Sequence, residues 1–79
     1  MNLTNEQLNK VRKKFKFSKR EMSILELLLS GTESMKDMAK DMKVSERMIK
    51  NYMQRIFLKT GRRKKLSAVL KCLEIFDLR

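Results

Sequence analysis

Serines that stand directly before runs of apolar residues at helical spacing constrain the fold of this chain most. A serine hydroxyl accepts a hydrogen bond from the free N–H groups of a helix's first turn, so this placement marks a helix start. Three serines have it: Ser18, Ser34 and Ser45. Glu21 follows Ser18 by three residues and completes a capping box. The two glycines of the chain, Gly31 and Gly61, stand where two of these helices should end.

The apolar residues between these signals recur every three or four positions, and no alternating run of β-branched residues occurs. The sequence therefore predicts an all-α chain of five helices. The first begins behind Thr4 or Asn5, and the last runs from about Leu66 or Ser67 to Phe76. The helix behind Ser18 is apolar almost all round, which is typical of a central helix. The seven methionines are interpreted as core filler.

The positive charge of the chain lies in two blocks. The net charge is +11, from 20 Lys and Arg against 9 Asp and Glu. Residues 10–20 carry seven positive charges and no negative one, and residues 43–65 carry nine positive charges and Glu46. The segment between the blocks is net negative. Such blocks predict a polyanionic partner, with nucleic acid ahead of an acidic membrane or an acidic protein.

Several classes of function are excluded by composition. One Cys and no His rule out an internal disulfide, a Cys/His metal cluster and His-dependent catalysis. No apolar run approaches the roughly 18 residues of a membrane span, and nothing resembles a signal peptide, so we expect a cytoplasmic protein. No activated nucleophile or small-molecule site is evident, and we expect no enzymatic activity and no cofactor. Cys72 lies on an apolar helix face, where burial should make its thiol unreactive.

The helices behind Ser34 and Ser45 are separated by only a few residues, which is the layout of a helix-turn-helix. The second of them, over residues 46–60, has an apolar side made by Ile49, Met53 and Ile56. Its opposite face carries donors and acceptors that suit base edges in the major groove. These candidate base contacts are Arg47, Lys50, Asn51 and Gln54. Candidate phosphate contacts from the same reasoning are Ser45, Arg55, Lys59, Arg62, Arg63 and Lys64.

Five short stretches together resemble a known family. Phe-Ser-Lys-Arg-Glu at 17–21 is similar to Leu-Thr-x-Arg-Glu, and Ser-Met-Lys-Asp-Met-Ala at 34–39 is similar to Ser-Asn-Lys-Glu-Ile-Ala. Residues 44–52 resemble Ile-Ser-x-x-Thr-Val-Lys-x-His, with Met48 and Tyr52 in place of threonine and histidine. Residues 56–61 resemble Ile-x-x-Lys-Leu-Gly, and Ala-Val at 68–69 matches the last helix. This order and spacing resemble the LuxR/GerE-type helix-turn-helix domain of bacterial transcription regulators.

The resemblance implies a four-helix DNA-binding domain over residues 17–79, preceded by a short basic amphipathic helix within residues 1–16. It implies that Lys50, Asn51 and Gln54 reach base edges. It implies phosphate contacts from Lys36, Ser45, Arg47, Tyr52 and Lys59. So few residues before the motif make the chain similar to the stand-alone GerE-like members.

Dimers in this family usually pair through the last helix. That helix has two apolar stripes, and we assign Leu66, Val69, Leu70 and Leu73 to the core. The second stripe is surplus to one core and is the expected dimer interface: Ala68, Cys72, Ile75 and Phe76. In the alternative, the first helix covers this stripe within one chain.

The leading hypothesis is a homodimeric, sequence-specific regulator that binds double-stranded DNA. One alternative is a fragment like region 4 of a sigma factor, which binds RNA polymerase. Another is a protein-interaction module that pairs with a related regulator and silences it. Three roles fit the first helix: a free basic arm that follows the DNA, a lid on the last helix, or a second dimerisation element. Membrane binding by this helix is disfavoured because its apolar face is short.

Overall fold

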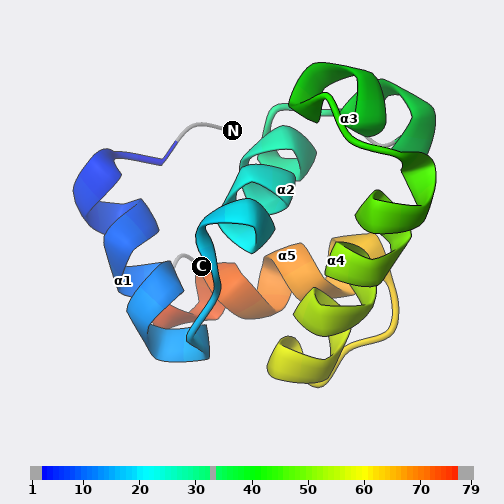
Figure 1. Cartoon of the computed structure of the whole chain (residues 1–79). Coiled ribbons are helices and arrows are strands. Elements are labelled where there is room, and N and C mark those ends of the chain that lie inside the picture. Colours follow the sequence, from blue (N-terminus) through cyan, green and yellow to red (C-terminus); the bar gives the residue numbers. More distant parts are fainter. Residues whose placement is uncertain (1–2, 33, 77–79) are drawn as a thin grey trace.

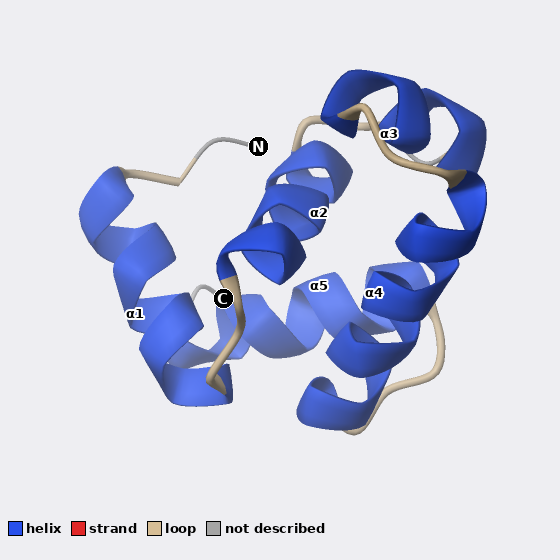
Figure 2. Cartoon of the chain, viewed as in Figure 1, coloured by secondary structure: helices blue, strands red, loops and turns tan. Residues whose placement is uncertain are grey.

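The computed structural model describes residues 3–32 and 34–76, and within them every regular element is a helix. The elements are α1 (Asn5–Phe15), α2 (Lys19–Leu29), α3 (Met35–Met42), α4 (Glu46–Thr60), α5 (Lys65–Leu73) and a short 3₁₀ helix, η1 (Glu74–Phe76). Figure 1 shows α2 in the middle of the molecule, with α1 on one side and α3 and α4 on the other. Figure 2 shows only helices and connecting loops. The predicted all-α fold is confirmed.

The predicted serine caps are present at the start of three helices. The Oγ atoms of Ser18, Ser34 and Ser45 accept hydrogen bonds from backbone N–H groups three residues on, at 3.2, 3.4 and 3.1 Å. The Glu21 carboxylate accepts in return from the N–H of Ser18, at 2.9 Å, which confirms the capping box. A second capping box, between Thr4 and Gln7, starts α1. Side-chain capping therefore fixes where four of the five helices begin.

One helix ends as predicted, and two others end in a way that the sequence did not signal. As expected, Gly61 ends α4 in the left-handed conformation, with a φ of 73°. Lys16 and Lys43 take the same conformation after α1 and α3, each with a φ of 57°. The left-handed region costs an L-residue about 1 kcal/mol or more, so side chains there are uncommon. The neighbours of both lysines are held in place by packing, since Phe17 is buried and Met42 and Val44 pack against the core.

The core lies where α2, α4 and α5 meet, with α1 and α3 closing its sides. The predicted core residues of α4 are confirmed, since Ile49, Met53 and Ile56 are at most 3% exposed. The interpretation of all methionines as core filler is wrong for Met35 and Met48, which are 38% and 40% exposed. Both stand in the first turn of a helix, Met35 on α3 and Met48 on α4. The fully buried side chains come from every helix: Val11, Ile24, Leu25, Met38, Ile49, Ile56, Ala68 and Cys72.

The predicted faces of α5 are right in part, because Leu73 is buried and Val69 packs against the core as expected. Ala68 and Cys72 were expected at a dimer surface, but they are 0% and 1% exposed within one chain. Leu66 and Leu70, assigned to the core, are 70% and 54% exposed. The remaining members of the predicted dimer stripe, Ile75 and Phe76, are half-buried against the core.

Helix α5 packs mainly against α4 and α2. Val11 of α1 is fully buried in the core cluster that also holds Ala68 and Cys72. The free-arm role for α1 is therefore wrong, whereas the lid role and the role as a second dimerisation element stay predictions. Burial raises the pKa of the Cys72 thiol to about 12, which confirms that this cysteine is an unreactive core residue.

Candidate nucleic-acid interface

Helices α3 and α4 form the helix-turn-helix. Residues 43–45 join them, and the left-handed Lys43 reverses the chain within these three residues. The N–H of Val44 donates to the carbonyl oxygen of Ala39 at 3.0 Å, which closes the end of α3. Met38 and Ala39 are buried in the same cluster as Ile49 of α4. The angle between the two helices is therefore fixed by backbone hydrogen bonds and by packing.

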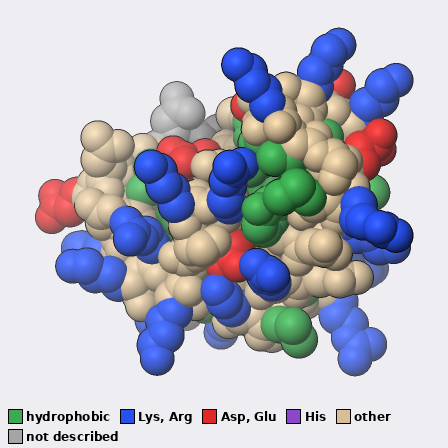
Figure 3. Space-filling model, viewed as in Figure 1, with side chains coloured by type: hydrophobic (Ala, Val, Ile, Leu, Met, Phe, Trp, Pro, Cys, Tyr) green, Lys and Arg blue, Asp and Glu red, His purple; other side chains and the backbone are tan. Residues whose placement is uncertain are grey.

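The outer face of α4 presents the four predicted base-contact residues together. Arg47, Lys50, Asn51 and Gln54 are all exposed, and the buried residues of α4 stand on the opposite side of the helix. Leu58 continues this face toward the end of α4 and is 82% exposed. Figure 3 shows Lys and Arg side chains gathered over α1, over the start of α2 and over α4 on one face of the molecule.

The predicted phosphate contacts border this face. Ser45 stands at the start of α4, where its hydroxyl already accepts from the N–H of Met48. The Arg55 guanidinium lies 5.9 Å from the centroid of the Tyr52 ring, a cation–π contact that orients both side chains. Lys36 is exposed on α3. The loop after Gly61 contributes three more exposed cations: Arg62, Arg63 and Lys64.

Lys59 differs from the other phosphate candidates because its ammonium group is bound inside the chain. Its Nζ atom lies 2.6 Å from Oε1 of Glu21 and donates to the carbonyl oxygen of Lys16 at 3.0 Å. The Glu21 side chain is 1% exposed, whereas that of Lys59 is 34% exposed. This ion pair joins the start of α2 to the last turn of α4.

The charge state of Glu21 is set by opposing effects. Burial raises the pKa of its carboxyl group, because an ion is less stable away from water. Hydrogen bonds from the Lys59 ammonium and the Ser18 N–H, with the charges of Lys59 and Arg55, outweigh burial and bring the pKa below its ordinary value. Glu21 is therefore ionised at neutral pH and holds Lys59 in place.

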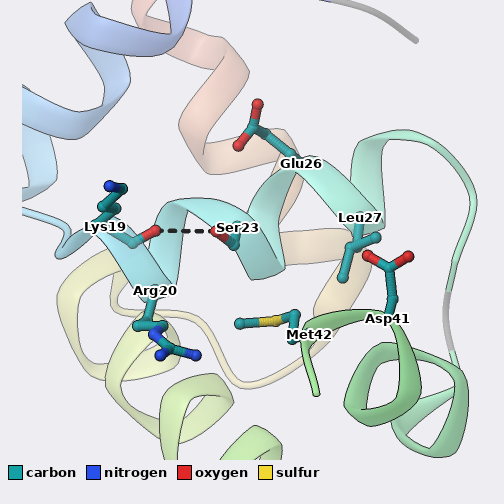
Figure 4. Close-up of a pocket in the computed structure, with 7 residues that line it drawn as sticks. All are labelled: Lys19, Arg20, Ser23, Glu26, Leu27, Asp41 and Met42. Carbon is teal, nitrogen blue, oxygen red and sulfur yellow. Dashed lines mark hydrogen bonds between the residues drawn. The ribbon is translucent and has the colours of Figure 1, made fainter. Parts of the chain in front are cut away.

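An open hollow lies between α2 and α3 (Figure 4). Lys19 and Arg20 line one end of it, and the hydroxyl of Ser23 donates to the carbonyl oxygen of Lys19 at 3.2 Å. The carboxylates of Glu26 and Asp41 line the hollow near Leu27 and Met42. Figure 4 shows Lys19 and Arg20 extending to opposite sides of α2. The cations at the start of α2 thus stand between α1 and the helix-turn-helix.

The described residues form neither a metal-binding cluster nor a membrane-spanning helix. No group of three or more Cys, Asp or Glu side chains there is arranged to hold a metal ion. None of the helices in residues 3–32 and 34–76 has the length and apolar character needed to cross a membrane.

These features define a helix-turn-helix domain with a cationic outer face, which is the class of nucleic-acid-binding regulatory domains. Residues 16–72 match the sequence profile of the GerE family, described as bacterial regulatory proteins of the luxR family. The chain belongs to this family, whose members are DNA-binding transcription regulators. Neither the curated proteins nor the solved structures contain a significant match to the chain.

Proposed function

We propose that this protein is a sequence-specific transcription regulator of the bacterial cytoplasm, which reads the major groove of double-stranded DNA with α4. One observation carries the proposal. Helix α4 has a buried apolar side that anchors it and an exposed side on which Arg47, Lys50, Asn51 and Gln54 stand together. Amide side chains pair bidentately with adenine and cationic side chains with guanine, so this face suits direct readout.

Cations beside α4 would position the helix without reading sequence. Arg62, Arg63 and Lys64 follow α4 directly and are exposed, which places them where a groove-bound helix meets the sugar–phosphate backbone. Lys59 supports the proposal in another way. Its bond to Glu21 fixes the end of α4, so that the outer face is held in one orientation before DNA arrives.

Selection of bound sequences from random duplexes at a stated salt concentration tests the proposal. We expect a defined consensus, and an inverted repeat if two copies bind. At the selected site, Gln54→Ala should cost roughly 1–3 kcal/mol and relax the preference at one base position. Arg63→Ala should weaken binding to all sequences alike and lower the salt slope by about one.

Lys71→Ala is the matched control for Arg63→Ala. Lys71 is paired with Glu74 at 3.2 Å on α5, outside the proposed interface, and its removal also takes away one positive charge. We expect its salt slope to match that of the unchanged protein. Selection without a consensus, or a Gln54→Ala variant with unchanged base preference, would contradict readout by α4.

The exposed leucines of α5 support a homodimer through this helix. Leu66 and Leu70 are four residues apart, stand on one side of α5 and are 70% and 54% exposed. The same leucines favour the second candidate function, a protein-interaction module that pairs with a related regulator or with RNA polymerase. Light scattering with and without DNA separates these functions, since only the module is a monomer that fails to bind any duplex.

A further inference from the structure

The basic block at residues 10–20 has no part in the function proposed above. Its cations are all exposed: Lys10, Arg12, Lys13, Lys14, Lys16, Lys19 and Arg20. Among the described residues two ion pairs form, Lys59 with Glu21 and Lys71 with Glu74, and neither uses a side chain of this block. The acidic side chains of the described residues therefore form no ion pair with this block. Five of its seven cations lie on α1 or directly after it.

Helix α1 holds these cations in fixed positions. Val11 is fully buried, and Leu8 and Phe15 pack against the same cluster. The rings of Phe15 and Phe17 are stacked with centroids 5.4 Å apart, and Phe17 is 4% exposed. The N–H of Phe17 also donates to the carbonyl oxygen of Arg12 at 3.0 Å. The cations of α1 thus stand on a helix anchored at both its middle and its end.

The cations divide between two sides of α1. Asn9, Arg12, Lys13 and Lys16 follow one another at helical spacing, and together with Phe17 they line a single hollow on the surface. The hollow contains three cationic side chains and no acidic one. Lys10 and Lys14 do not line it, because their positions place them on the other side of the helix.

The hollow side of α1 adjoins one flank of α4. The carbonyl oxygen of Lys16 accepts a hydrogen bond from Nζ of Lys59 at 3.0 Å, so the end of α1 is bound to the last turn of α4. Tyr52, Arg55 and Lys59 recur at helical spacing along this flank, and all three are candidate phosphate contacts. Lys16, which lines the hollow of α1, is thus bound to Lys59 on this flank of α4.

We propose that Arg12 and Lys13, with Lys16, form a second phosphate-binding surface, which contacts the DNA backbone beside the site read by α4. This inference rests on the proposed function, because it needs the DNA that α4 binds. It goes beyond that function because α1 lies before residues 16–72, the part of the chain that matches the family. The surface would lengthen the site by flanking contacts that carry no base preference.

The observations favour DNA over the other polyanions that fit a basic block. A membrane-bound helix needs an apolar face to insert, and the apolar residues of α1 face the core of this chain. An acidic protein partner would also need to make favourable contacts with the surface beside α1. The neighbouring surface here is the flank of α4, where Arg55 is a candidate phosphate contact.

Paired double variants test the inference. Arg12→Gln with Lys13→Gln removes two charges from the hollow side of α1, and Lys10→Gln with Lys14→Gln removes two from the other side. Glutamine keeps helix propensity, so both variants should retain the melting temperature. Affinity for the selected duplex is measured over a range of salt concentrations, together with interference by ethylation of single phosphates.

We expect the Arg12/Lys13 variant to lower the salt slope by about 2, at roughly 0.9 per lost phosphate contact. Ethylation of the flanking phosphates should no longer interfere with binding of this variant, whereas ethylation elsewhere should still interfere. The base preference of the variant should be unchanged. The Lys10/Lys14 variant should keep the slope and the interference pattern. If the two variants lower the salt slope equally, the effect comes from the overall positive charge and not from a particular contact. If neither variant changes the slope, α1 makes no phosphate contact. Either result overturns the inference.

The proposed function fails separately. If the unchanged protein selects no consensus, readout by α4 is wrong, whatever the α1 variants do. If it selects a consensus that Gln54→Ala relaxes, while the Arg12/Lys13 variant keeps the full salt slope, only the second surface is wrong.

Discussion

The pairing of Glu21 with Lys59 shows how one residue serves two structural roles. Oε1 of Glu21 accepts from the N–H of Ser18 at the start of α2 and from the Lys59 ammonium at the end of α4. The carboxylate is buried, and its pKa is lowered by these donors. A buried charge that loses its partner is costly, so the pair fixes the position of α4 more than it adds net stability.

We predict that Glu21→Gln lowers the free energy of unfolding by about 2 kcal/mol at neutral pH, because Lys59 loses its ionic partner. The pKa of Glu21 is lower in the folded chain than the ordinary value of 4.5, so its contribution is present above about pH 4.5. The contribution is lost as the pH falls through the folded pKa. The stability difference between the two proteins should therefore close in acid, as measured by urea unfolding at a series of pH values.

Glu74→Gln is the control for this prediction. Glu74 pairs with Lys71 at 3.2 Å on the surface of the molecule, where an ion pair contributes little. We expect a change within experimental error at every pH. A stability gap between the Glu21 variant and the unchanged protein that stays constant down to pH 2 would show that the carboxylate's charge is not the cause.

Local signals at single residues were readable from the sequence, and distant ones were not. The capping box between Ser18 and Glu21 spans three residues, and the structure confirms it. The bond from Glu21 to Lys59 spans 38 residues, so no local pattern marks it. The left-handed conformation of the two lysines was not predicted, for a related reason. Their conformation is imposed by the packing of the helices on either side, whereas glycine adopts it by intrinsic preference.

At the scale of elements, α5 differs from the other helices in its start. Its N-cap position is Lys64, in extended conformation with φ −121° and ψ 147°, and no side chain caps the helix. The backbone is thus already arranged for a capping residue, but lysine has no acceptor. Lys64 also belongs to the cationic loop that we assign to phosphates. The lysine at this position therefore supplies a positive charge but does not cap the helix.

We predict that Lys64→Ser stabilises the protein and weakens its binding to DNA. A serine hydroxyl can accept from an N–H of the first turn, which should add about 1 kcal/mol to the free energy of unfolding. Loss of the charge should lower the salt slope of DNA binding by about one. Thermal unfolding and salt titrations on the same preparation measure both effects.

Lys64→Ala separates the two causes, since it removes the charge without supplying a cap. It should show the same reduced salt slope with no gain in stability. A Lys64→Ser variant that is no more stable than Lys64→Ala would contradict the proposed cap.

The starts of α1 to α4 were predictable because side-chain capping is local, but the faces of α5 were not. Both stripes of α5 are apolar, so periodicity alone gives no reason to prefer one for the core. The choice depends on how α5 packs against α2 and α4, which periodicity does not show. On α4 the same reasoning succeeded, because only one side of that helix is apolar throughout.

At the scale of the whole molecule, the packing of the helices determines which side chains stay outside. Helix α5 packs against α2 and α4 and leaves Leu66 and Leu70 exposed. The hydrogen bond from Lys59 to the carbonyl oxygen of Lys16 brings the end of α1 to the last turn of α4. The proposed dimer surface and the proposed DNA surface therefore both follow from tertiary packing.

The proposed dimer gives the prediction that tests the arrangement of the whole molecule. Leu66→Gln with Leu70→Gln should convert the dimer to a monomer in light scattering. The apolar surface of these two leucines is exposed to water in one chain and would be buried only in the dimer. Binding to an inverted repeat should weaken strongly, whereas binding to a single half-site should be nearly unchanged. Melting temperature should also change little, since both leucines are exposed in one chain.

Leu58→Gln provides the control, because Leu58 is 82% exposed but lies on α4. If self-association came from exposed leucines in general, this variant would also dissociate; pairing through α5 predicts that it stays dimeric in the absence of DNA. A Leu66/Leu70 variant that remains dimeric would place the interface elsewhere. If the unchanged protein is monomeric and binds no duplex, the exposed face of α5 serves a different partner, and the protein-interaction module is the better account of this helix.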